Sequence, residues 1–175
     1  MIYKFSTLPL DRMACFSTIS SFAILWGITL YIGLYSPMSK GYFWPAIVWL
    51  AFFAAYLWQA RFYTLQEDRV VVHRFIGNIV IPLNKIETVQ IVEKLPISLR
   101  LFGSGGLFGY FGIFQLEQGG RIRLYATRSA GLVVIKADKV YAISPNNSAE
   151  FCQRVMAYME SSGVKKKVEE TCIPK

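Results

Sequence analysis

Two long stretches without a charged residue are the strongest constraint on how this chain folds. No Asp, Glu, Lys or Arg lies between Arg12 and Lys40, and none lies between Lys40 and Arg61. A helix needs about 20 mostly apolar residues to cross the hydrocarbon core of a bilayer. Residues 13–35 and 42–60 supply that length, so the sequence predicts two transmembrane helices.

The linker between these stretches, residues 36–41, is short and rich in turn-forming residues, which makes the two helices antiparallel neighbours. Aromatic side chains gather near the helix ends, as in interfacial belts: Tyr31, Tyr35, Tyr42, Phe43, Trp44, Tyr56 and Trp58. A cleaved signal peptide is the alternative for the first stretch. Its apolar run is longer than the about 7–15 residues of such peptides, and no small-x-small cleavage site closes it. We therefore expect a helical hairpin.

Basic residues flank both outer ends of the expected hairpin: Lys4, Arg12, Arg61, Arg69 and Arg74. The connecting linker carries only Lys40. The positive-inside rule then places both termini, including the N-terminal segment 1–12, on the cytoplasmic side of the inner membrane. No acid, base or histidine lies within the apolar stretches, so an anchor is favoured over a transporter.

Composition supports a membrane anchor followed by a small domain. The chain is 54% hydrophobic and 17% charged, whereas about a quarter of the residues in a typical soluble domain are charged. The net charge of +8 does not indicate nucleic-acid binding, because the basic residues are scattered among acids. A cytoplasmic face near anionic lipid explains the excess.

The three cysteines show neither a disulfide framework nor metal-type spacing. Cys15 lies in the first apolar stretch, whereas Cys152 and Cys172 lie near the far end of the chain. Cys152 stands between apolar neighbours and is expected to pack as a small core residue. We expect no metal and no cofactor.

From Phe62 onward the apolar pattern becomes that of β-strands. Eight short strands are predicted, at residues 62–65, 69–75, 79–81, 87–93, 113–117, 121–126, 132–136 and 140–143. Short polar or glycine-rich turns join several of them, at 66–68, 119–120 and 137–139.

A helix is predicted after the last strand. Phe151, Val155, Tyr158 and Met159 recur at helical spacing. Ser144 is the expected N-cap and Pro145 the first helical residue. This helix is the natural plug for the open end of a small barrel or bent sheet.

The order of these elements resembles the bacterial pleckstrin-homology-like (PH-like) domains found in small membrane proteins. The resemblance covers about residues 61–162 and rests on four features: the strand-turn-strand from Tyr63, the segment 81–86, the glycine-rich segment 101–112 that runs into Phe114, and 143–145 followed by Phe151. It implies a mainly-β barrel of two roughly orthogonal antiparallel sheets capped by a C-terminal helix, with 163–175 as a polar tail.

The resemblance implies no single activity, because this scaffold hosts lipid, peptide and protein binding alike. Lipid-headgroup binding in eukaryotic relatives uses basic residues at the first hairpin. That turn is here Gln66-Glu67-Asp68, and two acids would repel an anionic headgroup. We therefore expect no headgroup site in the usual place.

The glycine-rich segment 101–112 is the most unusual feature of the β region. It is not a phosphate loop, because a strand follows it and no Gly-Lys-Ser occurs. Two interpretations stay open. The glycines permit tight turns between strands, or the apolar side chains form an exposed loop that touches the bilayer or a partner. On the second interpretation the candidate contact residues are Lys94, Arg100, Phe102, Leu107, Phe108, Tyr110 and Phe111.

No catalytic constellation is present. His73, the single histidine, stands in a strand among valines, and Ser104 lacks a nucleophile elbow because Phe102 replaces its first glycine. The predicted function is a membrane-tethered cytoplasmic binding or scaffolding module that is not an enzyme. Its expected partners are the bilayer and a protein of unknown identity, and homo-oligomers remain open. The alternative is an accessory subunit that contacts a larger membrane complex through the hairpin.

Overall fold

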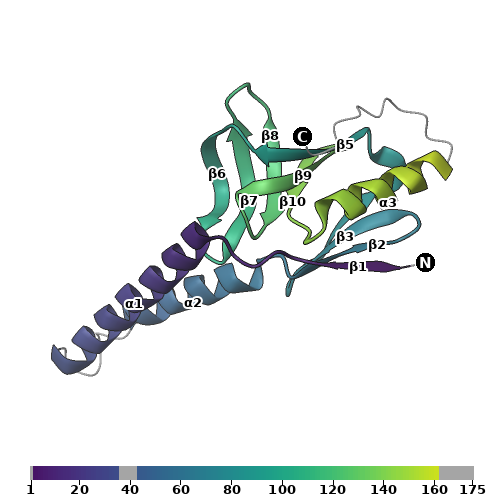
Figure 1. Ribbon diagram of the computed structural model, residues 1–175. Helices are drawn as coiled ribbons and strands as arrows, with labels where there is room; N and C mark the ends of the chain where they lie inside the picture. Colours follow the sequence, from purple (N-terminus) through teal and green to yellow (C-terminus); the bar gives the residue numbers. More distant parts are fainter. Residues whose placement is uncertain (1, 36–42, 162–175) are drawn as a thin grey trace.

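The computed structural model describes residues 2–35 and 43–161. Two helices, α1 (Arg12–Tyr35) and α2 (Phe43–Leu57), extend from a mainly-β domain that a third helix, α3 (Ser148–Ser161), completes (Figure 1). The predicted linker 36–41 and the polar tail 163–175 lie outside the described residues.

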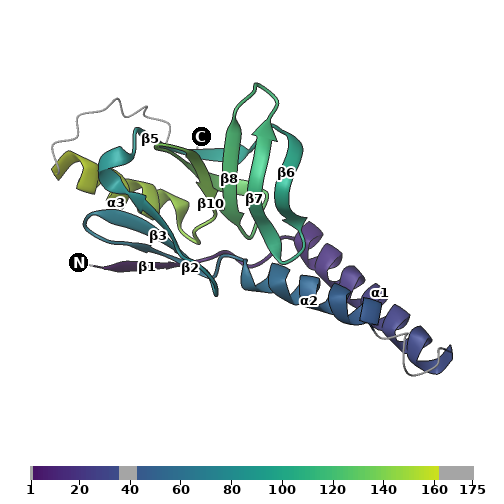
Figure 2. The same cartoon turned by 180° about the vertical axis from the view of Figure 1, so that it is seen from behind.

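Helix α1 has 24 residues and is the one described helix that is long and apolar enough to cross a membrane. At about 1.5 Å per residue it measures about 36 Å. Helix α2 is apolar but has 15 residues. The two helices lie side by side in both views (Figures 1 and 2). Trp49 Nε1 donates to Thr29 Oγ1 at 3.1 Å, and the Trp49 and Phe22 rings meet edge to face at 5.5 Å.

The second helix ends three residues before the predicted end at Ala60. Its last turn closes with Trp58 N donating to Ala55 O at 3.3 Å and Gln59 N donating to Tyr56 O at 3.4 Å. Ala60 is buried in the core of the β domain. The helix therefore ends before Ala60, which already belongs to the packing of the domain.

The described strands form two open sheets. One has the order β1-β2-β3-β4, built from β1 (Tyr3–Ser6), β2 (Phe62–Leu65), β3 (Arg69–His73) and β4 (Ile79–Pro82). The other has the order β5-β9-β10-β8-β7-β6, built from β5 (Thr88–Lys94), β6 (Ile97–Gly106), β7 (Gly109–Leu116), β8 (Arg121–Ala126), β9 (Ala130–Lys136) and β10 (Val140–Ile143). A short 3-10 helix, η1 (Leu83–Lys85), leads from the first sheet to the second. No strand pairing joins the sheets in this part of the chain, so the expected closed barrel is not observed.

The expectation of purely antiparallel sheets is wrong at one pair. Strand β10 pairs antiparallel with β9 but parallel with β8, in the register Val140 to Ile122. The reason is topological, because β10 inserts between two strands that run in opposite directions. It can be antiparallel to only one of them.

Strand β1 was not predicted. The N-terminal segment 1–12 was expected to precede the domain, yet Tyr3–Ser6 pairs with β2, and Thr7 forms an isolated bridge with Pro145. Phe5 is 5% exposed, and its ring meets Phe151 edge to face at 5.2 Å. The chain segment that holds α1 and α2 is therefore inserted between two neighbouring strands of one sheet.

An apolar core lies between the two sheets and α3, which packs against β5, β9 and η1, and a second, smaller apolar cluster is built from β7, β8, β9 and β10. Cys152 is fully buried in the first of these, so its predicted core role is confirmed. The predicted N-cap is wrong. Helix α3 begins at Ser148, where Glu150 N donates to Asn147 Oδ1 at 3.2 Å. Ser144 is buried instead, and its hydroxyl accepts from Thr127 N at 2.8 Å.

Candidate functional site

The glycine-rich segment is a β-hairpin rather than a loop. Strands β6 and β7 pair up to Gly106 and Gly109, and Leu107 and Phe108 form the turn between them. Strand geometry points alternate side chains to opposite faces. In this register Phe111 pairs with Ser104, and Phe102 lies two residues from Ser104 on the same face, yet Phe111 is buried at 6% exposure whereas Phe102 is 62% exposed. Of the two interpretations that the sequence left open, the first therefore fits the backbone, and the exposed loop of the second does not fit Phe111, which is buried.

Two glycines let the hairpin strands approach each other closely. Gly103 and Gly112 face each other across the β6–β7 pair with φ of 109° and 123°. A Cβ on Gly103 would stand 2.0 Å from Phe111 O, and one on Gly112 would stand 2.1 Å from Phe102 O. No other residue fits either position.

The tip of the hairpin docks between the two N-terminal helices. The Phe108 ring lies 4.8 Å from the Phe52 ring and 5.4 Å from the Tyr56 ring of α2. Phe108 N donates to Thr18 Oγ1 of α1 at 3.0 Å. Phe108 has a φ of 56°, which is costly for a bulky side chain. The contacts with both helices hold it there.

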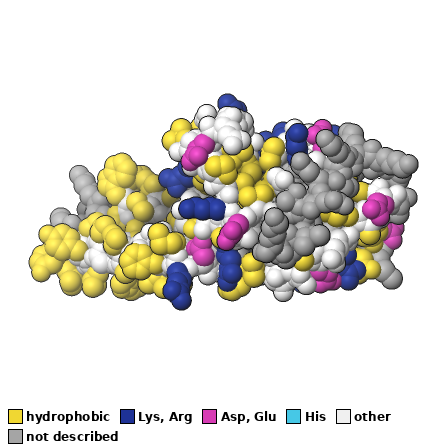
Figure 3. Space-filling view, turned by 45° about the horizontal axis from the view of Figure 1, so that its top comes forward, with side chains coloured by type: hydrophobic (Ala, Val, Ile, Leu, Met, Phe, Trp, Pro, Cys, Tyr) yellow, Lys and Arg dark blue, Asp and Glu magenta, His cyan; other side chains and the backbone are white. Residues whose placement is uncertain are grey.

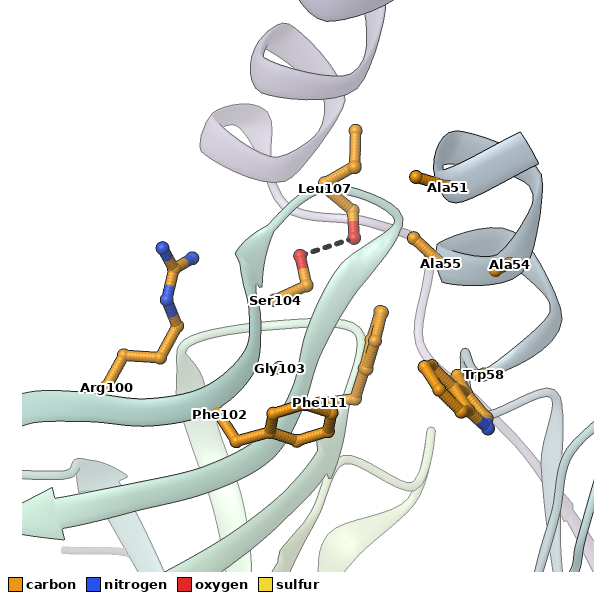
Figure 4. Close-up of a pocket in the computed structure, with 10 residues that line it drawn as sticks. All are labelled: Ala51, Ala54, Ala55, Trp58, Arg100, Phe102, Gly103, Ser104, Leu107 and Phe111. Carbon is orange, nitrogen blue, oxygen red and sulfur yellow. Dashed lines mark hydrogen bonds between the residues drawn. The ribbon is translucent and has the colours of Figure 1, made fainter. Parts of the chain in front are cut away.

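A pocket of about 400 Å³ opens between this hairpin and α2 (Figure 4). Ligand pockets in proteins commonly have volumes of about 300–1,000 Å³. Its lining residues are Ala51, Ala54, Ala55, Trp58, Arg100, Phe102, Gly103, Ser104, Leu107 and Phe111. The small side chains of the three alanines leave room for this pocket. Arg100 is the one charged residue of the lining. The Ser104 hydroxyl donates to Leu107 O at 2.8 Å, so it is already engaged.

A second pocket of about 180 Å³ adjoins the first. The two pockets share Trp58, Phe102 and Phe111. The second one is also lined by Arg74, Gly112, Ile113, Arg123 and Tyr125. These three shared aromatic side chains therefore separate a mainly apolar pocket from a basic one.

The arginines of this site have no acidic neighbour in the pocket linings. The Arg74 guanidinium donates to Gly77 O and lies 5.5 Å from the centre of the Tyr125 ring. Among the described residues, Arg74, Arg100 and Arg123 form no ion pair. The acidic side chains of the described ranges therefore do not pair with these three arginines.

Four of the seven residues predicted from sequence, Arg100, Phe102, Leu107 and Phe111, line the first pocket. The other three lie elsewhere. Phe108 is held by the helices, Tyr110 donates to Asp11 Oδ1 at 3.3 Å, and Lys94 pairs with Ala130 at the end of β5. That a ligand or the membrane contacts these residues stays a prediction.

Sequence reasoning missed the pocket residues contributed by α2 and by strands outside the hairpin. Arg123 lies on β8 of one sheet, and Arg74 follows β3 of the other. The spacing of the two residues along the chain does not predict that they line one pocket. One signal was available. Ala54 and Ala55 are adjacent small residues in a helix that otherwise carries many large side chains, and small residues let a neighbouring element or ligand approach closely.

His73 has a structural role in this arrangement. Its ring stacks on Phe62 at 4.3 Å, and Nε2 lies 2.9 Å from Thr64 Oγ1. Burial, together with the positive charge of Lys4, lowers the pKa of His73 below its ordinary value. Across residues 2–35 and 43–161, no group of three or more His, Cys, Asp or Glu side chains is placed to hold a metal ion.

Comparison with protein families gives one match. Residues 61–158 match the family model described as the bacterial PH domain. Searches of curated proteins and of solved structures returned no match. The matched region includes the β6–β7 hairpin, Arg74 and Arg123, but it leaves out β1, α1 and α2.

Proposed function

Because this chain belongs to the bacterial PH domain family, we propose that it is a membrane-tethered binding module. The paired helices anchor it, and the β domain holds a ligand or partner in the pocket between α2 and the β6–β7 hairpin. The observation that carries the proposal is the position of this pocket. It lies at the junction where the apolar helices enter a domain of a binding-module family.

The strand pairing supports a two-helix transmembrane hairpin. Strand β1 lies before α1 and pairs with β2, which follows α2. Asp11, at the start of α1, also accepts hydrogen bonds from Ser129 of the β domain, at 2.9 Å from its hydroxyl and 3.1 Å from its N–H. The two outer ends of the helices therefore lie on one side. If α1 crosses the bilayer, the chain must return through the segment that contains α2.

The charge distribution supports a cytoplasmic position for the β domain. Figure 3 shows hydrophobic side chains over the helices and Lys and Arg side chains where the helices meet the domain. Arg12 begins α1, and Arg61 follows α2, with its guanidinium 4.2 Å from the centre of the Phe75 ring. Basic residues at the membrane surface are typical of the cytoplasmic side.

Site-specific photocrosslinking of the full chain in native membranes tests this proposal. A benzophenone amino acid replaces Phe102 at the pocket, and in a matched control it replaces Leu99, which is 57% exposed on the same strand. We expect an adduct at position 102 that mass spectrometry identifies and that is absent at 99.

A second variant shows whether the adduct depends on the pocket. Ala51→Phe fills the pocket, whereas Leu50→Phe adds the same ring to an exposed position outside it. We expect the first change to remove the adduct and the second to leave it. Equal labelling at 102 and 99, or an adduct that survives Ala51→Phe, contradicts the proposal. Adducts from a probe at Leu34 alone would favour the accessory-subunit alternative.

A further inference from the structure

The two adjoining pockets differ in chemistry, and their order matches the polarity of a membrane lipid. The larger pocket is lined by alanines, aromatic rings and Leu107, and the smaller one carries Arg74 and Arg123. We propose that this double pocket binds an anionic phospholipid. One acyl chain lies along α2 in the larger pocket, and the phosphate-bearing headgroup lies between Arg74 and Arg123. The inference rests on the proposed function, because it names the ligand class of the same site.

The direction of the double pocket follows from the strand register. The larger pocket is lined by residues close to the hairpin tip, such as Leu107, which docks beside the apolar helices. The smaller pocket is lined by Ile113 and by Arg123, its pairing partner on β8. Leu107 and Phe102 are five positions apart, which corresponds to about 16 Å at about 3.3 Å per residue. Arg123, as the partner of Ile113, thus lies farther from the hairpin tip than Leu107 does.

A phospholipid in the leaflet has the same order, with its acyl chains toward the bilayer centre and its headgroup toward the water. A lipid that enters beside α2 would keep its tail on the apolar side and would meet the arginines with its phosphate. Trp58, which belongs to both pockets, stands between the two zones. Tryptophan is enriched at this depth of a membrane because its ring is amphipathic.

The charges favour an anion over a zwitterion or a cation. Arg74 and Arg123 line the smaller pocket, Arg100 lines the larger one, and no acid lines either. Guanidinium groups bind phosphate oxygens through paired hydrogen bonds, which ammonium groups cannot do. The Arg74 side chain is already fixed by its bonds to Gly77 O, so less conformational freedom is lost on binding.

This site differs from a headgroup site at the first hairpin. The β2–β3 turn carries Glu67 and Asp68, and the Asp68 carboxylate pairs with its neighbour Arg69 at 2.6 Å. The basic lining lies instead on β8 and directly after β3. The arginine pocket is the one that complements an anion.

Native mass spectrometry of the full chain released from detergent micelles tests the inference. The probes are phosphatidylglycerol and phosphatidylcholine with identical acyl chains. We expect phosphatidylglycerol to bind about tenfold more tightly, because the arginines repel the choline cation of phosphatidylcholine. The double variant Arg74→Gln, Arg123→Gln should remove this preference, because it weakens phosphatidylglycerol binding more than phosphatidylcholine binding. Arg121→Gln, on the same strand but outside both pockets, is the matched control.

Three further results distinguish a lipid from free phosphate, and a failure of this inference from a failure of the proposed function. Millimolar inorganic phosphate should not displace the lipid, because it lacks the acyl chain; displacement would assign the site to free phosphate. Equal affinity for the two lipids in the native chain, or an unchanged preference in the double variant, overturns the headgroup assignment. The proposed function then still stands if the Phe102 adduct depends on the open pocket. If the double variant unfolds at lower temperature than the native chain, Arg123→Lys replaces it, and a preference that is reduced but retained supports the proposal.

Discussion

At the scale of single residues, Tyr63 shows how one buried hydroxyl joins three parts of the domain. Its Oη donates to Tyr125 O at 2.7 Å and accepts from Ser144 N at 3.2 Å. The side chain is fully buried, and burial raises the pKa of Tyr63 to about 12. The hydroxyl therefore satisfies backbone groups of β8 and of the segment after β10.

Tyr63→Phe should destabilise the domain because it leaves these buried backbone groups without a partner. The expected loss is about 1–3 kcal/mol in the free energy of unfolding, measured by denaturant titration in detergent. Tyr31→Phe, at an exposed position of α1, is the control. The folded-state pKa is raised, so protonated Tyr63 stabilises the fold below pH 10, and this contribution is lost as pH rises toward 12. An unchanged alkaline transition in the variant would contradict the assignment.

Asp11 fastens the start of α1 to the β domain. Its carboxylate accepts from Ala14 N at 2.7 Å, from the Ser129 N–H and hydroxyl, and from the Tyr110 hydroxyl. Burial raises the pKa of Asp11, but these hydrogen bonds together outweigh that effect, and the pKa lies below its ordinary value.

Asp11→Ala should lower stability at pH 7 by about 1–2 kcal/mol, the usual cost of losing an N-cap. Because the folded-state pKa is depressed, the contribution is present above about pH 4 and is lost as pH falls through the folded value. Thermal unfolding at pH 7 and at pH 3 measures this. The difference between native chain and variant should shrink at pH 3, and the exposed Glu93→Ala control should show no difference at pH 7. A difference that stays constant with pH would contradict the role of the charge.

At the scale of secondary-structure elements, β1 lies outside the family match yet completes the first sheet. Phe5→Ala removes a ring that is 5% exposed and packs on Phe151. We expect a loss of about 3–5 kcal/mol, as for other buried phenylalanines, measured by denaturant titration. Ile2→Ala, next to β1 but 70% exposed, should change stability little. Equal effects of the two changes would mean that the domain does not depend on β1.

The β6–β7 hairpin depends on the close approach of its two strands. Gly112→Ala places a methyl group against Phe102 O, whereas a methyl group on Gly119, which has a φ of 83°, would meet no atom within 4 Å. Both changes strain a left-handed backbone, but only the first also clashes with backbone atoms. We expect Gly112→Ala to cost at least about 1–3 kcal/mol more than Gly119→Ala. Comparable losses of thermal stability in the two variants would show that backbone strain alone accounts for the cost of Gly112→Ala.

The elements found from the sequence are those whose signals are local. Strand β8 alternates and is preceded by Gly119-Gly120, and β10 follows a short polar turn, so their positions were predictable. Strand β1 has four residues, and its partner lies beyond both helices, so no local turn marks it. Strand β6 was hidden by its glycines, which ordinarily weaken strands. Arg100 and Phe102 were found because they lie in that unusual segment, whereas Arg74 and Arg123 meet only through tertiary structure.

At the scale of the whole molecule, the pairing of β1 with β2 limits the ways in which the apolar helices could cross a membrane. These strands are neighbours in one sheet, and the apolar helices lie between them in sequence. Threading one strand through the bilayer without the other would break the sheet and expose Phe5 and Tyr63, which are buried. The fold therefore requires an even number of crossings between the strands, independently of the positive-inside rule.

Cysteine accessibility tests this requirement. Cys15 and Cys172 are first replaced by serine, while buried Cys152 is retained, and the resulting chain serves as the background control. Single changes Lys4→Cys in β1 and Glu117→Cys in an exposed turn are then probed with a membrane-impermeant maleimide. We expect neither to react in intact spheroplasts and both to react after permeabilisation, because we propose that both belong to one domain on the cytoplasmic side. Lys40→Cys, in the predicted linker, should react from outside. Reaction of the first two from opposite sides would contradict the strand pairing, whereas reaction of both from outside would preserve the fold and reverse its orientation.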